Sequence, residues 1–265
     1  MKKETPQEKR ARLMEAAKAS LTSAYAGEEH SVMQAINSYL EFEKVRNQIF
    51  ERLEEWYSIY FPEFRAGSPT ALAKFIINFG ANKKKANVEE LRKAIGEGAE
   101  RLADQISKSI GREPTDEEFE AMKNMAESEL ALLKVETELD KYLEKSVKKL
   151  MPNISYLIDY KVAAELLAKA GSLERMGMMP SSTLQLLGAE KALFKHLKYG
   201  TKPPKYGILF KLPQIVQAPK KMKGRLARLY ANKLSIAAKA DAFSHKFIAE
   251  KLKEDIERLQ KKSRA

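Results

Sequence analysis

LGAEKALFKHLKYGTKPPKYGILF, residues 187–210, combines a helical pattern that becomes basic with a loop that contains two adjacent prolines. Lys191, Lys195 and Lys198 recur four and three residues apart, so they share one face of the predicted helix. Like charges at this spacing destabilise a helix slightly, and an anionic ligand explains them better than the needs of folding do. The stretch predicts a helical domain with an anion-binding surface.

The position of the net charge supports this interpretation. The formal net charge is +12, and residues 191–240 hold thirteen Lys or Arg and no Asp or Glu. The remainder is balanced, with 35 basic and 36 acidic residues. A positive field confined to one segment attracts a polyanion to one surface. A solvated lysine-rich face is the alternative, and fifty residues without an acidic side chain make it the weaker one.

The residue types exclude several classes of protein. The chain has no cysteine and only three histidines, which excludes a disulfide framework and thiol catalysis and leaves little for a metal site. No nucleophile or acid–base pair stands at a functional spacing, so we expect no enzyme, no metal and no cofactor. No apolar run is long enough to span a membrane, and the N-terminus lacks the apolar core of a signal peptide. We expect a soluble cytoplasmic protein without membrane contact.

A heptad pattern predicts a long helical hairpin. Apolar residues recur at seven-residue steps between residues 32 and 60, with Arg46 at one core position, and the pattern ends at Phe61-Pro62. A second long helix begins with a capping box, Thr115 to Glu118, and runs to Leu150. We expect the two helices to pack antiparallel and to self-associate as a homodimer. The predicted coiled-coil contacts are Tyr39, Phe42, Ile49, Leu53, Trp56, Leu139 and Leu143.

The fold class that follows is all-α, in three parts. Residues 1–30 form a basic helical extension with a capping box at Thr5, and an interruption is expected near Gly27. Residues 31–151 form the coiled-coil hairpin, with a tip insertion at about 63–113 in which the lysines at 83–85 are solvated. Residues 152–265 form a globular helical domain. Its predicted helices cover 153–170, 181 or 182 to 199, and about 221–258, and residues 208–210 form an extended piece.

The basic segment matches the requirements of RNA recognition. A leucine face formed by Leu184, Leu186, Leu193 and Leu197 should meet the core, which leaves the lysines outside. Lys221, Arg225 and Arg228 repeat the basic pattern on the last helix, and between the two helices the prolines stiffen a loop that carries Tyr206. Cations bind phosphates, and a flat ring accepts an unstacked base. We expect Glu190 to form a buried salt bridge or hydrogen bond and His196 to be a packing or surface residue.

Three segments carry a family resemblance. Residues 187–197 with 202–207 closely resemble the signature of the Nop domain of archaeal box C/D ribonucleoprotein core proteins. The similarity extends to residues 170–183 and 224–243, and residues 52–63 resemble the end of the family's first coiled-coil helix. Eukaryotic members include nucleolar core proteins and a spliceosomal pre-mRNA processing factor. The resemblance covers about residues 31–250.

The resemblance implies an RNA-binding scaffold without catalytic residues. Such a scaffold docks on a kink-turn RNA already held by a small ribosomal-protein-like partner, in particles that guide 2′-O-methylation. The predicted RNA-binding residues are Gly188, Ala189, Lys191, Lys195, Lys198, Lys202, Lys205, Tyr206, Lys221, Lys223, Arg225 and Arg228. The alternative is a coiled-coil protein-interaction module whose basic domain has no RNA specificity.

Two departures from the family pattern affect the expectations. Full-length archaeal members carry a fibrillarin-binding domain before the coiled coil, where this sequence has about thirty residues, so recruitment of the methyltransferase fibrillarin is not predicted. Tyr206 stands where the family usually has histidine, which keeps a flat ring and removes the protonatable group. Stacking on a base is compatible with this change.

Overall fold

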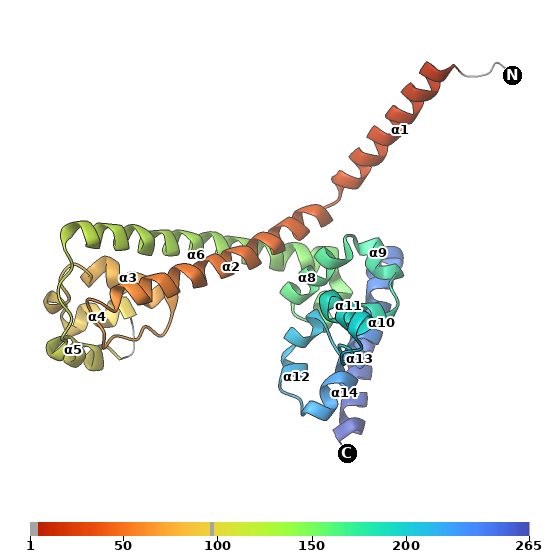
Figure 1. Cartoon of the computed structure of the whole chain (residues 1–265). Coiled ribbons are helices and arrows are strands. Elements are labelled where there is room, and N and C mark those ends of the chain that lie inside the picture. Colours follow the sequence, from red (N-terminus) through yellow and green to blue (C-terminus); the bar gives the residue numbers. More distant parts are fainter. Residues whose placement is uncertain (1–4, 96–97, 265) are drawn as a thin grey trace. The chain divides into compact units, whose positions relative to one another are not determined.

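The computed structural model describes residues 5–95 and 98–264, without the side chains of 20–21, 23–26, 94–95 and 260–264. Every regular element within them is helical, which confirms the all-α prediction (Figure 1). The α-helices are α1 (Pro6–Ala26), α2 (Glu29–Tyr57), α3 (Pro69–Phe79), α4 (Val88–Ile95), α5 (Ala99–Lys108), α6 (Asp116–Leu150), α7 (Pro152–Leu157), α8 (Tyr160–Ala170), α9 (Leu173–Met178), α10 (Ser181–Leu186), α11 (Glu190–Tyr199), α12 (Pro213–Val216), α13 (Lys220–Lys239) and α14 (Ala249–Arg264). Shorter turns are η1 (Lys83–Lys85), η2 (Ile208–Lys211) and the π-type η3 (Ala240–Ser244).

The chain forms two compact units. Residues 38–140 make one, called the hairpin unit below, and residues 1–37 with 141–265 make the other, called the basic unit. Their boundary falls within α2 and α6. The division at residues 30 and 151 that the sequence predicted stays a prediction.

Local capping signals were predicted correctly. The Thr5 hydroxyl accepts a hydrogen bond from the Glu8 amide at 3.3 Å, and the Glu8 carboxylate accepts one from the Thr5 amide at 2.8 Å. Thr115 and Glu118 form the same pair of bonds at the start of α6. Each box satisfies amides that have no partner within the helix. The break between α1 and α2 lies at Gly27, as expected.

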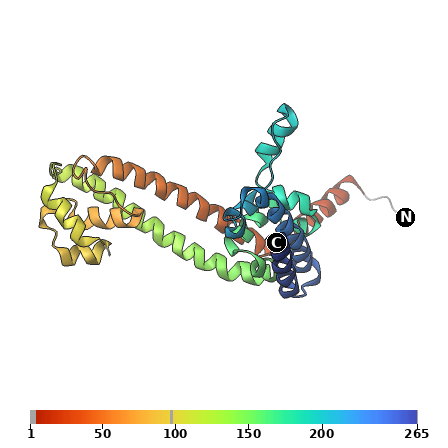
Figure 2. The same cartoon turned by 90° about the horizontal axis from the view of Figure 1, so that it is seen from below.

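In the hairpin unit, α2 and α6 lie side by side and antiparallel (Figures 1 and 2). Leu53 is buried, whereas Phe42, Ile49 and Trp56 remain half-buried. Arg46 occupies its core-type position by pairing with two carboxylates of α6, those of Glu129 and Glu136. The hairpin therefore contains a charged layer, and part of its apolar seam is incompletely covered.

The tip of the hairpin unit has its own aromatic core. Phe75 of α3 contacts the rings of Tyr57, Phe61, Phe64 and Phe79 at centroid distances between 4.7 and 5.9 Å. Helices α4 and α5 close this core with Leu91, Leu102 and Ile106. The short helices that the sequence predicted for the insertion are confirmed.

Lys83 contradicts the expectation that the lysine triplet is solvated. Its side chain is 1% exposed, and its ammonium donates to the carbonyl oxygens of Tyr60 at 2.7 Å and Gly111 at 3.0 Å. The Glu113 carboxylate lies 3.5 Å away. Both carbonyls belong to the chain segments that leave α2 and enter α6, so one buried cation joins the two ends of the insertion. Lys84 and Lys85 are exposed, as expected.

The basic unit is built from more, shorter helices than the sequence predicted. The helix expected over 153–170 is divided into α7 and α8, because Asp159 caps a new helix by accepting a 2.9 Å bond from the Lys161 amide. Gly171, in the left-handed conformation, ends α8 after Ala170, where the predicted helix over 153–170 also ends. The helix expected over 221–258 is divided by η3 and by His245, which has a φ of 53°. Residues 208–210 form a 3₁₀ turn, so the extended piece was wrong.

Asp241 explains why the last helix is interrupted. Its carboxylate is buried and accepts hydrogen bonds from the Asn153 amide and side chain and from the Ile154 amide, at 2.7 to 3.0 Å. The first turn of α7 is thus capped by a residue 88 positions away. Burial raises the pKa of Asp241 above its ordinary value, although these bonds act to lower it. A long-range contact determines the end of this helix.

Candidate nucleic-acid interface

The leucine-rich helix expected from about 181 to 199 breaks at Gly188. Gly188 has a φ of 87°, and a Cβ there would lie 2.6 Å from Cγ1 of Ile208. Both features require glycine. The break separates α10 from α11, which stands away from the other helices of the basic unit (Figure 2).

The break leaves α11 without a core-facing side. None of its ten residues is buried, and Phe194 and Leu197 are 68% and 71% exposed. The prediction that one leucine face meets the core is therefore wrong for Leu193 and Leu197, and among the four leucines only Leu184 is buried. The prediction treated these leucines as part of one helix with a single axis. Gly188 divides them between two helices, which have different axes.

Glu190 stabilises the turn at the start of α11. Its carboxylate accepts a 2.7 Å hydrogen bond from the Gly188 amide. The sequence predicted a hydrogen bond for this side chain, although the side chain lies at the surface. Partial burial acts to raise the pKa of Glu190, and the hydrogen bonds from the Gly188 and Glu190 amides outweigh it, so the pKa lies below its ordinary value. The ionised group suits a structural role better than acid catalysis.

The proline loop is tied to α10 by backbone pairing. The Gly207 amide donates to the Gln185 carbonyl at 2.9 Å, and the Ile208 amide donates to the Leu187 carbonyl at 2.8 Å. A Cβ on Gly207 would lie 2.0 Å from the Leu187 oxygen, so only glycine permits this approach. At the other end of the loop, the His196 ring is hydrogen-bonded to the Thr201 carbonyl. The loop is held in one conformation at both ends.

Helix α13 brings a second group of cations to the loop. The side chain of Lys205 lies against Gly224, where an added Cβ would be 3.6 Å from its Cδ. The first turns of α13 contain Lys220, Lys221, Lys223 and Arg225, no acidic residue and no side-chain cap. Cations at a helix N-terminus oppose the helix dipole at a cost of about 0.3–1 kcal/mol each. An anion bound at this end would remove that cost.

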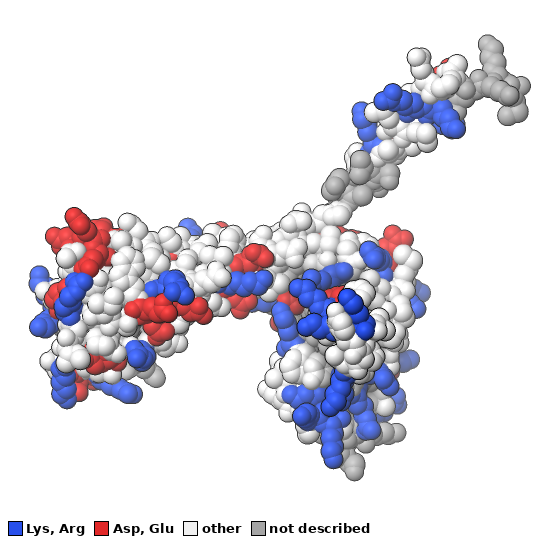
Figure 3. Space-filling model, in the orientation of Figure 1, with Lys and Arg blue, Asp and Glu red and all other residues white. Residues whose placement is uncertain are grey.

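The structure places the predicted RNA-binding residues in three neighbouring segments. These are α11 with its preceding turn (Gly188, Ala189, Lys191, Lys195, Lys198), the loop (Lys202, Lys205, Tyr206) and α13 (Lys221, Lys223, Arg225, Arg228). All of the lysines and arginines except Lys223 are exposed. Basic side chains gather over this part of the basic unit, whereas both signs are interspersed on the hairpin unit (Figure 3). Contact with RNA by each residue stays a prediction.

Lys223 and Tyr206 have partners within the chain. The Lys223 ammonium donates to the Val216 carbonyl at 2.8 Å and lies 5.1 Å from the centroid of the Phe210 ring. The Tyr206 ring stacks on the same Phe210 ring, with the two centroids 4.5 Å apart and an angle of 9° between the ring planes. Neither Phe210 nor Gln185 was predicted from the sequence as a functional residue. An aromatic residue four positions after Tyr206 was the available signal.

Other kinds of site find no support among the described residues. No group of three or more His, Asp or Glu side chains there is arranged to hold a metal ion. None of the helices in the described ranges is long and apolar enough to cross a membrane.

Comparison with known proteins decides the family. The profile described as Nop, snoRNA binding domain, fibrillarin, matches residues 38–262. This chain belongs to the Nop family. The resemblance inferred from residues 187–207 is thereby confirmed.

Relatives within the Nop family share about a third of their residues with the chain. An uncharacterised NOP5 family protein of Methanocaldococcus jannaschii is 37% identical over 238 residues, which cover 87% of this chain and 57% of that protein. Nucleolar protein 56 of Dictyostelium discoideum is 34% identical over 224 residues, covering 82% of this chain and 41% of that protein. The chain thus spans about half the length of these relatives.

A solved structure shares the fold. The crystal structure of a fibrillarin/Nop5p complex matches 96% of this chain and 76% of the solved chain, with a TM-score of 0.52 and 24% identity. The Nop family description also names fibrillarin. The expectation that fibrillarin is not a partner therefore has no support from these relatives.

Proposed function

We propose that this chain is a non-enzymatic RNA-binding scaffold of a box C/D-like small ribonucleoprotein. Membership of the Nop family supports this class of function. The observation that carries the proposal is the set of exposed cations on α11, the proline loop and α13, together with Tyr206 in that loop. Cations spread over three segments suit a polyanion better than a small anion.

The RNA partner that fits this surface contains both a helix and an unpaired base. Phosphates of the helical part would bind Lys191, Lys195, Arg225 and Arg228, and the unpaired base would stack on Tyr206. A kink-turn RNA held by a small ribosomal-protein-like protein satisfies both requirements. The scaffold reads the RNA and the bound protein together, so we expect weak binding to RNA alone.

The hairpin unit would supply protein contacts in the same particle. Its half-buried seam residues Phe42, Ile49 and Trp56 are available for a second copy of the chain. Fibrillarin would be a further partner of this assembly, since the description of the matching family names it. Pairing of the hairpin units would bring two basic units into one particle.

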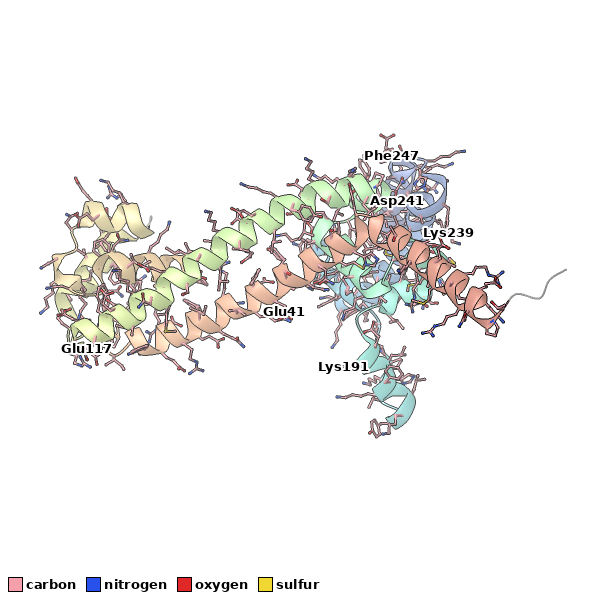
Figure 4. The ribbon with its side chains drawn as sticks, turned by 90° about the horizontal axis from the view of Figure 1, so that it is seen from above. Glu41, Glu117, Lys191, Lys239, Asp241 and Phe247 are labelled. Carbon is pink, nitrogen blue, oxygen red and sulfur yellow. The ribbon has the colours of Figure 1, made fainter. Side chains whose placement is uncertain are left out.

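Titration of a kink-turn RNA, with and without the small partner protein, tests the proposal. We expect the partner to raise the affinity substantially. Lys191→Ala should lower the magnitude of the slope of log K against log salt by about 0.7–0.9. Lys239→Ala is the matched control, because Lys239 is exposed on α13 and distant from Lys191 (Figure 4).

Two outcomes would reject the RNA scaffold. One is equal affinity with and without the partner protein, together with indifference to Lys191→Ala, Arg225→Ala and Tyr206→Ala. The other is recovery of stable protein complexes that are unchanged by ribonuclease and contain no RNA, which would favour the coiled-coil interaction module.

A further inference from the structure

Phe210 contacts two side chains at the proline loop, those of Tyr206 and Lys223. The rings of Tyr206 and Phe210 are nearly parallel, 4.5 Å apart at 9°. The Lys223 ammonium lies over the same Phe210 ring, 5.1 Å from its centroid. Its 2.8 Å hydrogen bond to the Val216 carbonyl fixes it there. Phe210 thus covers one face of the Tyr206 ring, and the Tyr206 side chain is half-buried.

The backbone on both sides of Tyr206 is held by Gln185. Its side-chain amide donates to the Lys205 carbonyl at 2.6 Å, and its own carbonyl accepts from the Gly207 amide at 2.9 Å. The peptide units before and after Tyr206 are therefore both attached to α10. Phe210 constrains the ring of Tyr206 and Gln185 constrains its backbone, and neither of these residues is a cation.

We propose that Phe210 and Gln185 are positioning residues that hold Tyr206 as a one-sided platform for a single unstacked nucleobase. The inference rests on the proposed function and adds to it the way the base is bound. A mobile loop tyrosine would lose rotational freedom on binding, whereas a ring already stacked on Phe210 loses little. Phe210 is 36% exposed, so its ring is not a member of the buried core. A role in positioning Tyr206 accounts for the stacking of the Phe210 ring on it.

The first test needs no RNA. Phe210 should shift the ring resonances of Tyr206 through its ring current, and Phe210→Leu should abolish that shift in the intact chain. Phe247→Leu is the control, since it removes an exposed ring of the same unit that contacts Tyr156 at 5.5 Å (Figure 4 shows its place). An identical Tyr206 spectrum in the wild-type chain and Phe210→Leu would overturn the platform.

The second test measures binding of a kink-turn RNA and its small partner protein, with 2-aminopurine at the unpaired position. Phe210→Leu should weaken binding about three- to tenfold, the range of a lost aromatic pair, without changing the salt slope. Phe210→Tyr should bind with the affinity of the wild-type chain. Gln185→Ala should lower the affinity, as Phe210→Leu does. In a Tyr206→Ala background, Phe210→Leu should cause no further loss, because the two residues act as one unit.

The outcomes separate this inference from the proposed function. Additive losses from Tyr206→Ala and Phe210→Leu would show that Phe210 acts independently of the platform. Wild-type binding that responds to Lys191→Ala and not to Tyr206→Ala or Phe210→Leu would keep the scaffold and refute the platform. Failure of the wild-type complex to bind this RNA would refute the proposed function itself.

Discussion

Arg46 of α2 donates hydrogen bonds of 2.8 Å from Nε and Nη2 to the two carboxylate oxygens of Glu129 on α6. The Glu129 side chain is fully buried, and that of Arg46 is 12% exposed. Hydrogen bonding to Glu129 raises the pKa of Arg46 above its already high value. A fork-shaped donor that matches a carboxylate in this way defines the relative register of two helices more strictly than apolar contacts do.

Breaking this pair should destabilise the hairpin unit strongly. Arg46→Ala leaves the Glu129 carboxylate buried without its partner, and we expect a loss of about 3–5 kcal/mol in the free energy of unfolding, measured by urea denaturation. Arg52→Ala is the control, because its pair with Glu55 is exposed. Equal effects of the two substitutions would contradict a dominant role for the buried pair.

The second prediction concerns Lys83. Lys83→Met keeps the apolar stem and leaves the carbonyls of Tyr60 and Gly111 without a donor, so the unit should lose about 1–3 kcal/mol for each buried group left unpaired. Lys84→Met changes the neighbouring exposed lysine and should alter stability by less than about 0.5 kcal/mol. Unfolding in urea distinguishes them, and similar midpoints would show that the burial of Lys83 is not needed.

The third prediction concerns acid stability. The Arg112 guanidinium, with the Thr115 amide, lowers the pKa of Glu118 from an ordinary value of 4.5 to about 2. A carboxyl whose folded pKa is depressed contributes stability above the unfolded pKa and loses it as the pH falls towards the folded pKa. The contribution of Glu118 should therefore disappear between about pH 4.5 and 2. Thermal unfolding of Glu118→Gln should show a weaker pH dependence in this window, and Glu117→Gln should behave as the wild-type chain.

The fourth prediction concerns the contact between the proline loop and α10. Gly207→Ala would place a methyl group 2.0 Å from the Leu187 oxygen, which requires the loop to separate from α10. We expect about 1–3 kcal/mol of destabilisation and weaker RNA binding. Gly224→Ala adds the same methyl group on α13 at ordinary contact distance from Lys205 and should be tolerated. Unchanged stability and RNA affinity in Gly207→Ala would contradict the close approach of Gly207 to the Leu187 oxygen.

The fifth prediction concerns self-association. Phe42 is half-buried on the seam of α2, so Phe42→Glu would place a charge in a contact between two hairpin units. Light scattering at tens of micromolar should show a dimer for the wild-type chain and a lower mass for this variant. Glu43→Lys alters an exposed neighbour and should not change the mass. A wild-type chain that is monomeric at these concentrations would contradict the predicted dimer.

Signals confined to a few neighbouring residues were sufficient to predict much of the fold. The capping boxes at Thr5 and Thr115 and the helix end at residue 170 were recognisable because each signal acts within about one helical turn. The excess of lysine and arginine over residues 191–240 likewise needed no coordinates, since charge composition is a property of the sequence. These features predicted the all-α class and the segment that carries the basic surface.

Only the tertiary structure decided where that surface stands and what supports it. Gly188 reads as a residue within a continuous helix until Ile208 is found against it, and Lys83 reads as a solvated lysine until two distant carbonyls are found beside it. Asp241 ends one helix by capping another 88 residues earlier. Such contacts join residues far apart in the chain, and their free energy depends on burial that no local pattern encodes. The sequence by itself determined the helices and the charge, and packing determined the broken helix, the buried cation and the covered face of Tyr206.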